Sequence, residues 1–288
     1  MRKSRRPMRL ESLEGRSLMA GNVFAAIRLG SLNIEGDSKA NEIAVVDLGG
    51  GRVQVTGQNG TKVNGLSSLI VTGNTTDFKA DLKGGNDIIS WRGIESHVAP
   101  RFSIETGNGD DSVFVDQLFA GRAKIESGLG NDVIEVLNAK AAILEIETQA
   151  GDDTVRFGSP SVVSNVAVLK LKIETGFGND LVQVQNSNFN ATSAKIELGS
   201  GDDRAFVNRI SGNASLNVSG GFGTDAVILE DSVFRDMEIE LGAGDSDDLR
   251  ITRVTSSRTK LSGGLGIADK LTIVDSKLGS LMRSGFEI

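Results

Sequence analysis

The sequence predicts an all-β protein that winds as a right-handed parallel β-helix or β-roll-like solenoid, with about 22 residues in each coil. Two observations predict this fold: one glycine-rich turn motif recurs along the chain, and short alternating apolar runs flank each copy. The composition agrees, because 36 glycines and only 3 prolines in 288 residues are typical of many tight turns between regular segments.

The turn motif has the form Gly-x-Gly-Asn/Asp-Asp and occurs, with small variations, nine times. From Gly85 to Gly266 its second glycine advances 181 residues in eight steps, a mean of about 22.6. Clear copies lie at Gly84–Asp87, Gly107–Asp111, Gly128–Asp132, Gln149–Asp153, Gly176–Asp180, Gly199–Asp203 and Gly221–Asp225, and weaker copies at Gly242–Asp245 and Gly264–Gly266. Such regular spacing indicates repeated structural units of one kind.

Alternating apolar pairs lie on both sides of each turn. Phe102 and Ile104 precede the turn at Gly107, and Val113 and Val115 follow it. Alternation over such short runs predicts half-buried strands. Two strands cannot bury their apolar faces alone, so the coils are expected to stack, with parallel strands about 4.8 Å apart and right-handed crossovers.

The pattern divides the chain into four parts. Residues 1–20 read as a basic export-type leader and residues 21–80 as an N-terminal cap or irregular first coils. Residues 81–275 hold the solenoid repeats, and residues 276–288 form a C-terminal tail or cap. The longest step between turns places an insertion near residues 159–167, in the loop that returns to the first strand.

The leader carries six basic and two acidic residues, and it lacks the apolar stretch of about 7–15 residues found in a conventional signal peptide. Its second half, Leu10–Ala20, reads LESLEGRSLMA. This stretch resembles the LExLExRxLxA sequence near the N-terminus of many large exported planctomycete proteins. The resemblance implies an extracellular or cell-surface protein. The alternative is an amphipathic basic arm on a protein that stays in the cytoplasm.

The composition limits the kinds of functional site and partner that the protein can have. The absence of cysteine excludes disulfides and thiolate metal sites, and a single histidine disfavours histidine-based catalysis. Outside the leader the chain carries a net charge of about −11, which disfavours nucleic acid as a partner and favours cations. No run approaches the roughly 18 apolar residues of a membrane span, so none is expected.

The last motif position is aspartate in seven consecutive turns. Equivalent positions stack in a solenoid, so these carboxylates are expected to form a column along one edge. At about 5 Å they would repel by roughly 1 kcal/mol in water and about 3 kcal/mol at an effective dielectric of 20. A bound hard cation would offset this repulsion, and calcium suits it better than magnesium because calcium accepts six to eight oxygens in flexible geometry.

Ser127–Glu135 reads SGLGNDVIE, which resembles the GGxGxDxUx nonapeptide of the hemolysin-type (RTX) calcium-binding repeat proteins. In that family the repeats form a parallel β-roll, and motif aspartates and loop carbonyls of adjacent turns enclose calcium. The resemblance covers roughly residues 80–270. It implies calcium binding by Asp87, Asp111, Asp132, Asp153, Asp180, Asp203 and Asp225, with the backbone carbonyls of Gly109, Gly130, Gly151, Gly178, Gly201 and Gly223.

This chain departs from the family in two ways. The motif comes once per coil instead of every nine residues, so only one edge is available for metal. The first glycine of the nonapeptide is also replaced in most copies, by Thr106, Ser127, Thr148 or Thr175. The alternative interpretation is a turn without metal, in which Asn and Asp side chains accept hydrogen bonds from nearby backbone N–H groups.

The sequence therefore predicts a secreted or cell-surface, calcium-binding β-solenoid with a structural or adhesive role. Its expected partners are calcium ions and a cell-envelope or extracellular polysaccharide or protein. The main alternative is a metal-independent structural or carbohydrate-binding β-helix. A polysaccharide lyase or hydrolase is disfavoured, because most steps leave little chain for a cleft and the paired carboxylates repeat from coil to coil. We therefore expect no enzymatic activity.

Overall fold

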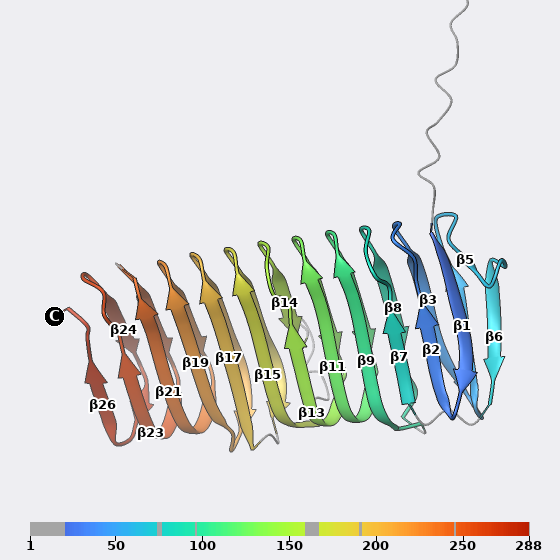
Figure 1. Cartoon of the computed structure of the whole chain (residues 1–288). Coiled ribbons are helices and arrows are strands. Elements are labelled where there is room, and N and C mark those ends of the chain that lie inside the picture. Colours follow the sequence, from blue (N-terminus) through green and yellow to red (C-terminus); the bar gives the residue numbers. More distant parts are fainter. Residues whose placement is uncertain are drawn as a thin grey trace, which may run out of the picture.

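The computed structural model describes residues 21–73, 77–95, 97–158, 167–189, 192–244 and 246–287. The predicted leader, most of the predicted insertion, Asp245 and Ile288 lie outside these residues. Within the described ranges 26 strands form two long sheets, one of 14 and one of 12 strands, which face each other along a rod (Figure 1). In the same ranges there is no helix that could cross a membrane.

The strands of the 14-stranded sheet lie in front in Figure 1. They are β1 (Asn22–Arg28), β2 (Ser31–Glu35), β5 (Lys62–Val63), β7 (Asp77–Asp81), β9 (Ala99–Asn108), β11 (Phe119–Leu129), β13 (Lys140–Glu147), β15 (Ala167–Phe177), β17 (Ser193–Ser200), β19 (Ser215–Phe222), β21 (Val233–Ala243), β23 (Thr255–Ser262), β25 (Lys277–Leu278) and β26 (Leu281–Ser284).

The 12-stranded sheet lies behind it. Its strands are β3 (Glu42–Gly49), β4 (Arg52–Gly57), β6 (Ser68–Thr72), β8 (Ile88–Arg92), β10 (Ser112–Asp116), β12 (Val133–Leu137), β14 (Thr154–Phe157), β16 (Leu181–Phe189), β18 (Arg204–Gly212), β20 (Ala226–Glu230), β22 (Asp248–Thr252) and β24 (Lys270–Val274).

Each coil places one strand in each sheet, and equivalent strands of successive coils pair in parallel. Ile104, Ile125 and Ile146, for example, lie in register across β9, β11 and β13. In Figure 1 the front strands from β7 onward run upward, and the chain returns behind them while it advances from right to left, which is right-handed winding. The predicted all-β parallel solenoid is therefore confirmed.

The N-terminal part of the chain folds differently from the repeats. β1 pairs with β2, and β4 with both β3 and β6, in antiparallel arrangement. Parallel stacking begins where β2 meets β7 and β3 meets β8. At the other end β25 and β26 both pair in parallel with β23, so the last described residues continue the stack.

A thin core fills the space between the sheets. The predicted pre-turn and post-turn apolar residues point inward and are buried, as at Ile125 and Ile134. The core has few aromatic side chains, but Phe78, Trp91 and Phe102 form one cluster, with the Phe78 ring centroid 4.5 Å from Trp91 and 4.9 Å from Phe102. One sheet face per strand is thus apolar, which is the alternation that the sequence predicted.

Candidate functional site

The glycine turns lie along one edge of the rod, the upper edge in Figure 1. Gly128 and Gly130 have φ angles of 104° and 126°, in the region that glycine adopts most readily. Stacking adds a second constraint, because a Cβ at Gly130 would lie 2.1 Å from the carbonyl oxygen of Gly109 in the preceding coil. The glycines are therefore required by both the turn and the close approach of successive coils.

The seven predicted aspartates form one column inside this edge, and each is at most 2% exposed. Within the column, the backbone N–H of one aspartate donates to Oδ1 of the aspartate in the next coil. The six bonds measure 2.7–3.0 Å and join Asp87 to Asp111, Asp111 to Asp132, Asp132 to Asp153, Asp153 to Asp180, Asp180 to Asp203 and Asp203 to Asp225. We call this row of bonds the aspartate ladder.

Three further residues extend the ladder, and the sequence motif did not identify them. The N–H of Asn41 donates to Asp87 at 2.6 Å, and at the other end Asp225 donates to Asp247 and Asp247 to Asp269, at 2.7 and 3.1 Å. All three lie two residues before an alternating apolar pair, as Asp269 precedes Leu271. This spacing is the sequence signal that could have identified the three residues. The turns before Asp247 and Asp269 depart from the glycine motif, so a search for the motif does not find them.

A second ladder runs on the outside of the same turns, in the opposite direction. Here the N–H of a later coil donates to Oδ1 of the preceding coil, as from Asn131 to Asp110 at 2.9 Å and from Asp152 to Asn131 at 2.7 Å. The acceptors are Asn86, Asp110, Asn131, Asp152, Asn179 and Asp202. Asn and Asp accept equally well through Oδ1, which explains why both occur at this position.

Buried hydroxyls lie beside the aspartate ladder. Thr106, Thr148 and Thr175 each donate to a carbonyl of the next coil, at 3.0, 3.0 and 2.7 Å. These residues, with Ser127, are the ones that replace the first glycine of the nonapeptide. Within the described residues, Oδ2 has no hydrogen-bond partner in Asp87, Asp111, Asp132, Asp153, Asp180, Asp203 and Asp225.

Burial raises the pKa values of the carboxyls in this column. Loss of hydration raises the pKa of each of the seven carboxyls above 3.8, and bonds from backbone N–H groups act in the opposite direction. The pKa rises to about 7 for Asp87, Asp153 and Asp225 and to about 6 for Asp111 and Asp203. Near neutral pH part of the column therefore holds protons.

The predicted calcium ligands can be compared with this geometry. Calcium takes six to eight oxygens, whereas each aspartate of the column has one carboxylate oxygen, Oδ2, without a hydrogen bond to any described group. The six predicted glycine carbonyls point along the rod, since a Cβ on the glycine of the next coil would lie 1.7–2.1 Å from each. As arranged, the turns do not fit a calcium ion. In the described ranges no group of three or more His, Cys, Asp or Glu is placed to hold a metal.

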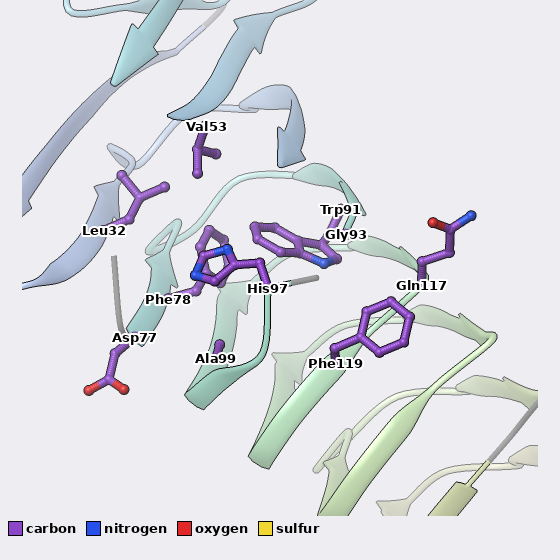
Figure 2. A pocket seen from close by; sticks show the side chains of 10 residues that line it. All are labelled: Leu32, Val53, Asp77, Phe78, Trp91, Gly93, His97, Ala99, Gln117 and Phe119. Atoms are coloured by element: carbon purple, nitrogen blue, oxygen red, sulfur yellow. The ribbon is translucent and has the colours of Figure 1, made fainter. Parts of the chain in front are cut away.

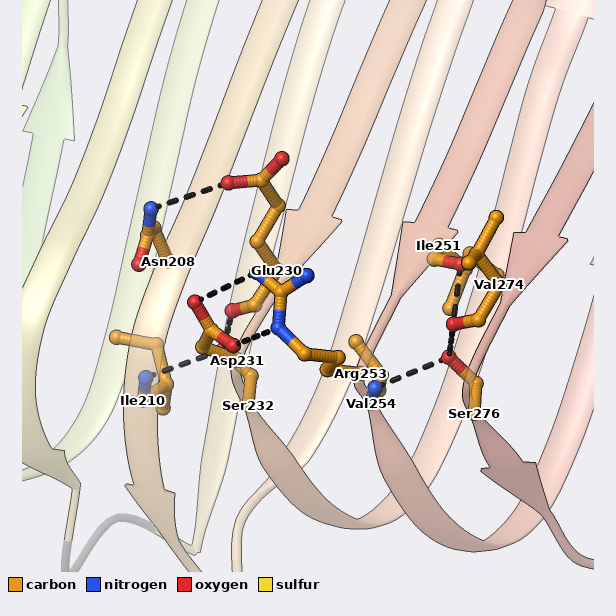
Figure 3. Close-up of polar contacts among 10 residues, drawn as sticks. All are labelled: Asn208, Ile210, Glu230, Asp231, Ser232, Ile251, Arg253, Val254, Val274 and Ser276. Carbon is orange, nitrogen blue, oxygen red and sulfur yellow. Dashed lines mark hydrogen bonds and ion pairs between the residues drawn. The ribbon is translucent and has the colours of Figure 1, made fainter.

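Serine plays a comparable role on the opposite edge (Figure 3). The N–H of Ile210 donates to Oγ of Ser232 in the next coil at 3.1 Å, and Ser232 donates to the carbonyl of Glu230 at 2.6 Å. On the outside of this edge Arg253 forms a two-bond ion pair with Asp231. Both edges thus use side chains to join coils where the strands turn away from each other.

A small cavity of about 10 Å³ lies beside the aromatic cluster (Figure 2). Trp91 and Phe119 line it, and nearby His97 contacts Asp47 through Nδ1 and Oδ2 at 2.5 Å. This volume holds about one water molecule. The cavity is therefore too small for an organic substrate.

The chain matches no family model, no curated protein and no solved structure among those compared with it.

Proposed function

We propose that this protein is a rigid structural rod, in which a metal-independent ladder of buried aspartates joins successive coils. The observation that supports the proposal is the unbroken row of N–H to Oδ1 bonds from Asn41 to Asp269. Strands leave the sheet at each corner and lose their backbone partners there, and buried N–H groups without partners cost about 1–3 kcal/mol each. The ladder supplies those partners.

The proposal assigns no catalytic role to the carboxylates. In the ladder they repeat with the same hydrogen bonds in coil after coil, whereas a reaction site requires one group that differs from its neighbours in surroundings. The proposal also covers the location of the protein. The resemblance of Leu10–Ala20 to the leader of exported planctomycete proteins supports a place at the cell surface or outside the cell, where the rod acts as a spacer or adhesive module.

Calcium binding is the second candidate, favoured by the free Oδ2 of seven buried aspartates. A calcium ion would bind through these Oδ2 atoms and would need further oxygens to complete its six to eight ligands. The two candidates differ in what stabilises the stack, because a metal that binds only the folded chain raises its stability in proportion to the logarithm of its concentration.

Thermal melts of the full chain, followed by far-UV circular dichroism, test the proposal. They compare chelator, calcium and magnesium at equal ionic strength. We expect the three melts to superimpose. A calcium-specific rise in melting temperature, absent with magnesium, would contradict the metal-independent ladder and favour the second candidate. Surface proteolysis and fractionation of cells that express the tagged full chain test export separately.

A further inference from the structure

The crests of the glycine turns form an exposed row of side chains that the structural role does not use. Except for Ala150, which follows Gln149, each crest residue lies between two glycines. Each is in register with its counterpart in the next coil, as Phe177 is with Ser200 and Ser200 with Phe222. We define the crest row as Leu129, Ala150, Phe177, Ser200, Phe222, Ala243 and Leu265.

Large apolar and small residues alternate strictly along this row. The large members are well exposed: Leu129 by 51%, Phe177 by 69%, Phe222 by 67% and Leu265 by 91%. Each is separated from the next by one small residue, so they recur every two coils, or about 9.6 Å. Scattered exposed apolar residues are ordinary, but a regular row of them along one edge indicates an interaction surface.

We propose that the crest row binds a second copy of this chain, antiparallel to the first and displaced by one coil. The order of sizes is the same in both directions from Ser200. A two-fold-related copy therefore presents the same spacing in reverse, and a displacement of one coil sets large side chains against small ones. The facing pairs are Phe222 with Ser200, Phe177 with Ala243 and Leu265 with Ala150, each formed twice.

Other arrangements pack less well. An antiparallel copy without displacement sets Phe177 against Phe222 and leaves Ser200 facing itself across a gap. A parallel two-fold dimer sets every residue against itself. In both arrangements the large side chains meet each other and keep the two rods apart. Voids are then left between the small residues, so van der Waals contact is lost there. In the displaced antiparallel arrangement Phe177, Phe222 and Leu265 each face a small residue. The opposite displacement does the same for Phe177, Phe222 and Leu129, but it also sets Glu174 against Glu197 and Glu126 against Glu240.

The charges beside the crest row favour the same displacement. Without it, Asp202 would face Asp202 and Glu197 would face Glu197. With it, uncharged residues face acidic ones: Thr224 faces Asp202, Ile267 faces Asp152, Ser219 faces Glu197 and Ser262 faces Glu147. Among the described flanking residues one like-charged pair is left, Glu174 with Glu240, and Lys172 lies 2.7 Å from Glu174.

The contact is small. Six facing coils span about 24 Å, and a strip one side chain wide buries far less than the roughly 1,200 Å² of the smaller stable complexes. The dimer is therefore expected to be weak and to form at high micromolar concentration or above. Neighbouring rods held at high density on a surface would meet that condition.

Sedimentation equilibrium of the full chain, up to about 1 mM, tests the proposal. We expect a monomer–dimer equilibrium whose dissociation constant rises at least about tenfold in the double variant Phe177→Ser/Phe222→Ser. Phe114→Ser is the matched control, because Phe114 is an exposed phenylalanine of β10, away from the crest row. It should leave the dissociation constant unchanged, and circular dichroism melts verify that each variant is folded.

An exchange of large and small residues tests the displacement itself. Ser200→Phe should weaken the dimer although it adds apolar surface, because it fills the space that receives Phe222. Adding Phe222→Ser to that variant should restore the dimer, since the large and small members of the pair then change places. Small-angle scattering of the dimer should show a particle that is wider than one rod and much shorter than two rods end to end, with an overhang because the facing coils lie nearer the C-terminal end of the stack.

Several results would overturn the proposal. A monomer at every concentration, a tighter dimer with Ser200→Phe, no rescue by the exchange, or an end-to-end particle would each do so. If the wild-type chain is monomeric and instead binds insoluble polysaccharide in a way that depends on Phe177 and Phe222, the crest row is a glycan-binding surface and not a dimer interface.

Discussion

The backbone N–H of Asp132 donates a hydrogen bond of 2.7 Å to Oδ1 of Asp153, its counterpart in the next coil. The bond joins two residues 21 positions apart in the sequence, both buried at the corner of the solenoid. The side chain of Asp153 thereby replaces a backbone carbonyl as acceptor where the strands diverge. The ladder is thus a continuation of the sheet by side chains, and its energetics can be tested one rung at a time.

Replacement of Asp153 should separate hydrogen bonding from charge. Asp153→Ala leaves the buried N–H of Asp132 without an acceptor, so we expect a loss of about 1–3 kcal/mol in the free energy of unfolding. Asp153→Asn keeps an oxygen for that N–H and removes a buried charge, so at pH 8 it should be neutral or stabilising. Urea unfolding followed by circular dichroism measures both. Equal losses in the two variants would mean that the charge, not the acceptor, is needed.

Stability should fall as the pH rises from about 4 to about 7. Five ladder carboxyls have folded-state pKa values of about 6 to 7, above the unfolded value of 3.8. The folded chain therefore binds more protons than the unfolded chain in this window, and the stability present below pH 4 is lost as these groups ionise. Urea midpoints across pH 4–8 measure the slope. A calcium ladder predicts the opposite sign in calcium, since protons compete with the metal.

The buried hydroxyls should moderate this pH dependence. Thr148 donates to the carbonyl of Thr175 at 3.0 Å. Burial raises the pKa of Asp153, and the polar hydroxyl of Thr148 beside it acts in the opposite direction. Thr148→Val keeps the shape and removes the hydroxyl, so we expect a loss of about 1–2 kcal/mol and a pKa of Asp153 raised further. The loss of stability with rising pH should then extend to higher pH. A pH profile parallel to that of the wild type would show that the hydroxyl does not act on the carboxyl.

The glycine column should tolerate no side chain. Gly130→Ala combines a φ of 126° with a Cβ 2.1 Å from the carbonyl oxygen of Gly109, and we expect a loss of at least about 3 kcal/mol. Gly50→Ala is the matched control, because Gly50 has a φ of 61° and no atom within 4 Å of its Cβ position. It should lose only about 1–2 kcal/mol. Similar losses at both sites would indicate that stacking does not constrain the turn.

The sequence was sufficient to predict which residues lie inside the strands. Val113 and Val115 are buried because they alternate along a strand, and alternation is visible in five consecutive residues. It also located the seven aspartates on one column. It did not reveal that this column is buried. It also did not reveal that Asp247 and Asp269 continue the column, because the motif is irregular at Gly244 and Gly266.

The sequence alone determined the solenoid, because the features that predict it are local. Each coil carries the repeat spacing, the apolar alternation and the turn glycines within its own 22 or so residues. The partners of the aspartates are not local. From Asp111 onward each Oδ1 meets an N–H that lies 21–27 residues away along the chain, and the Oδ1 of Asp87 meets one 46 residues away, only after the coils stack. Tertiary structure therefore decided whether a carboxylate faces water, an ion or a neighbouring amide, because stacking alone sets the burial and the hydrogen-bond donors around it.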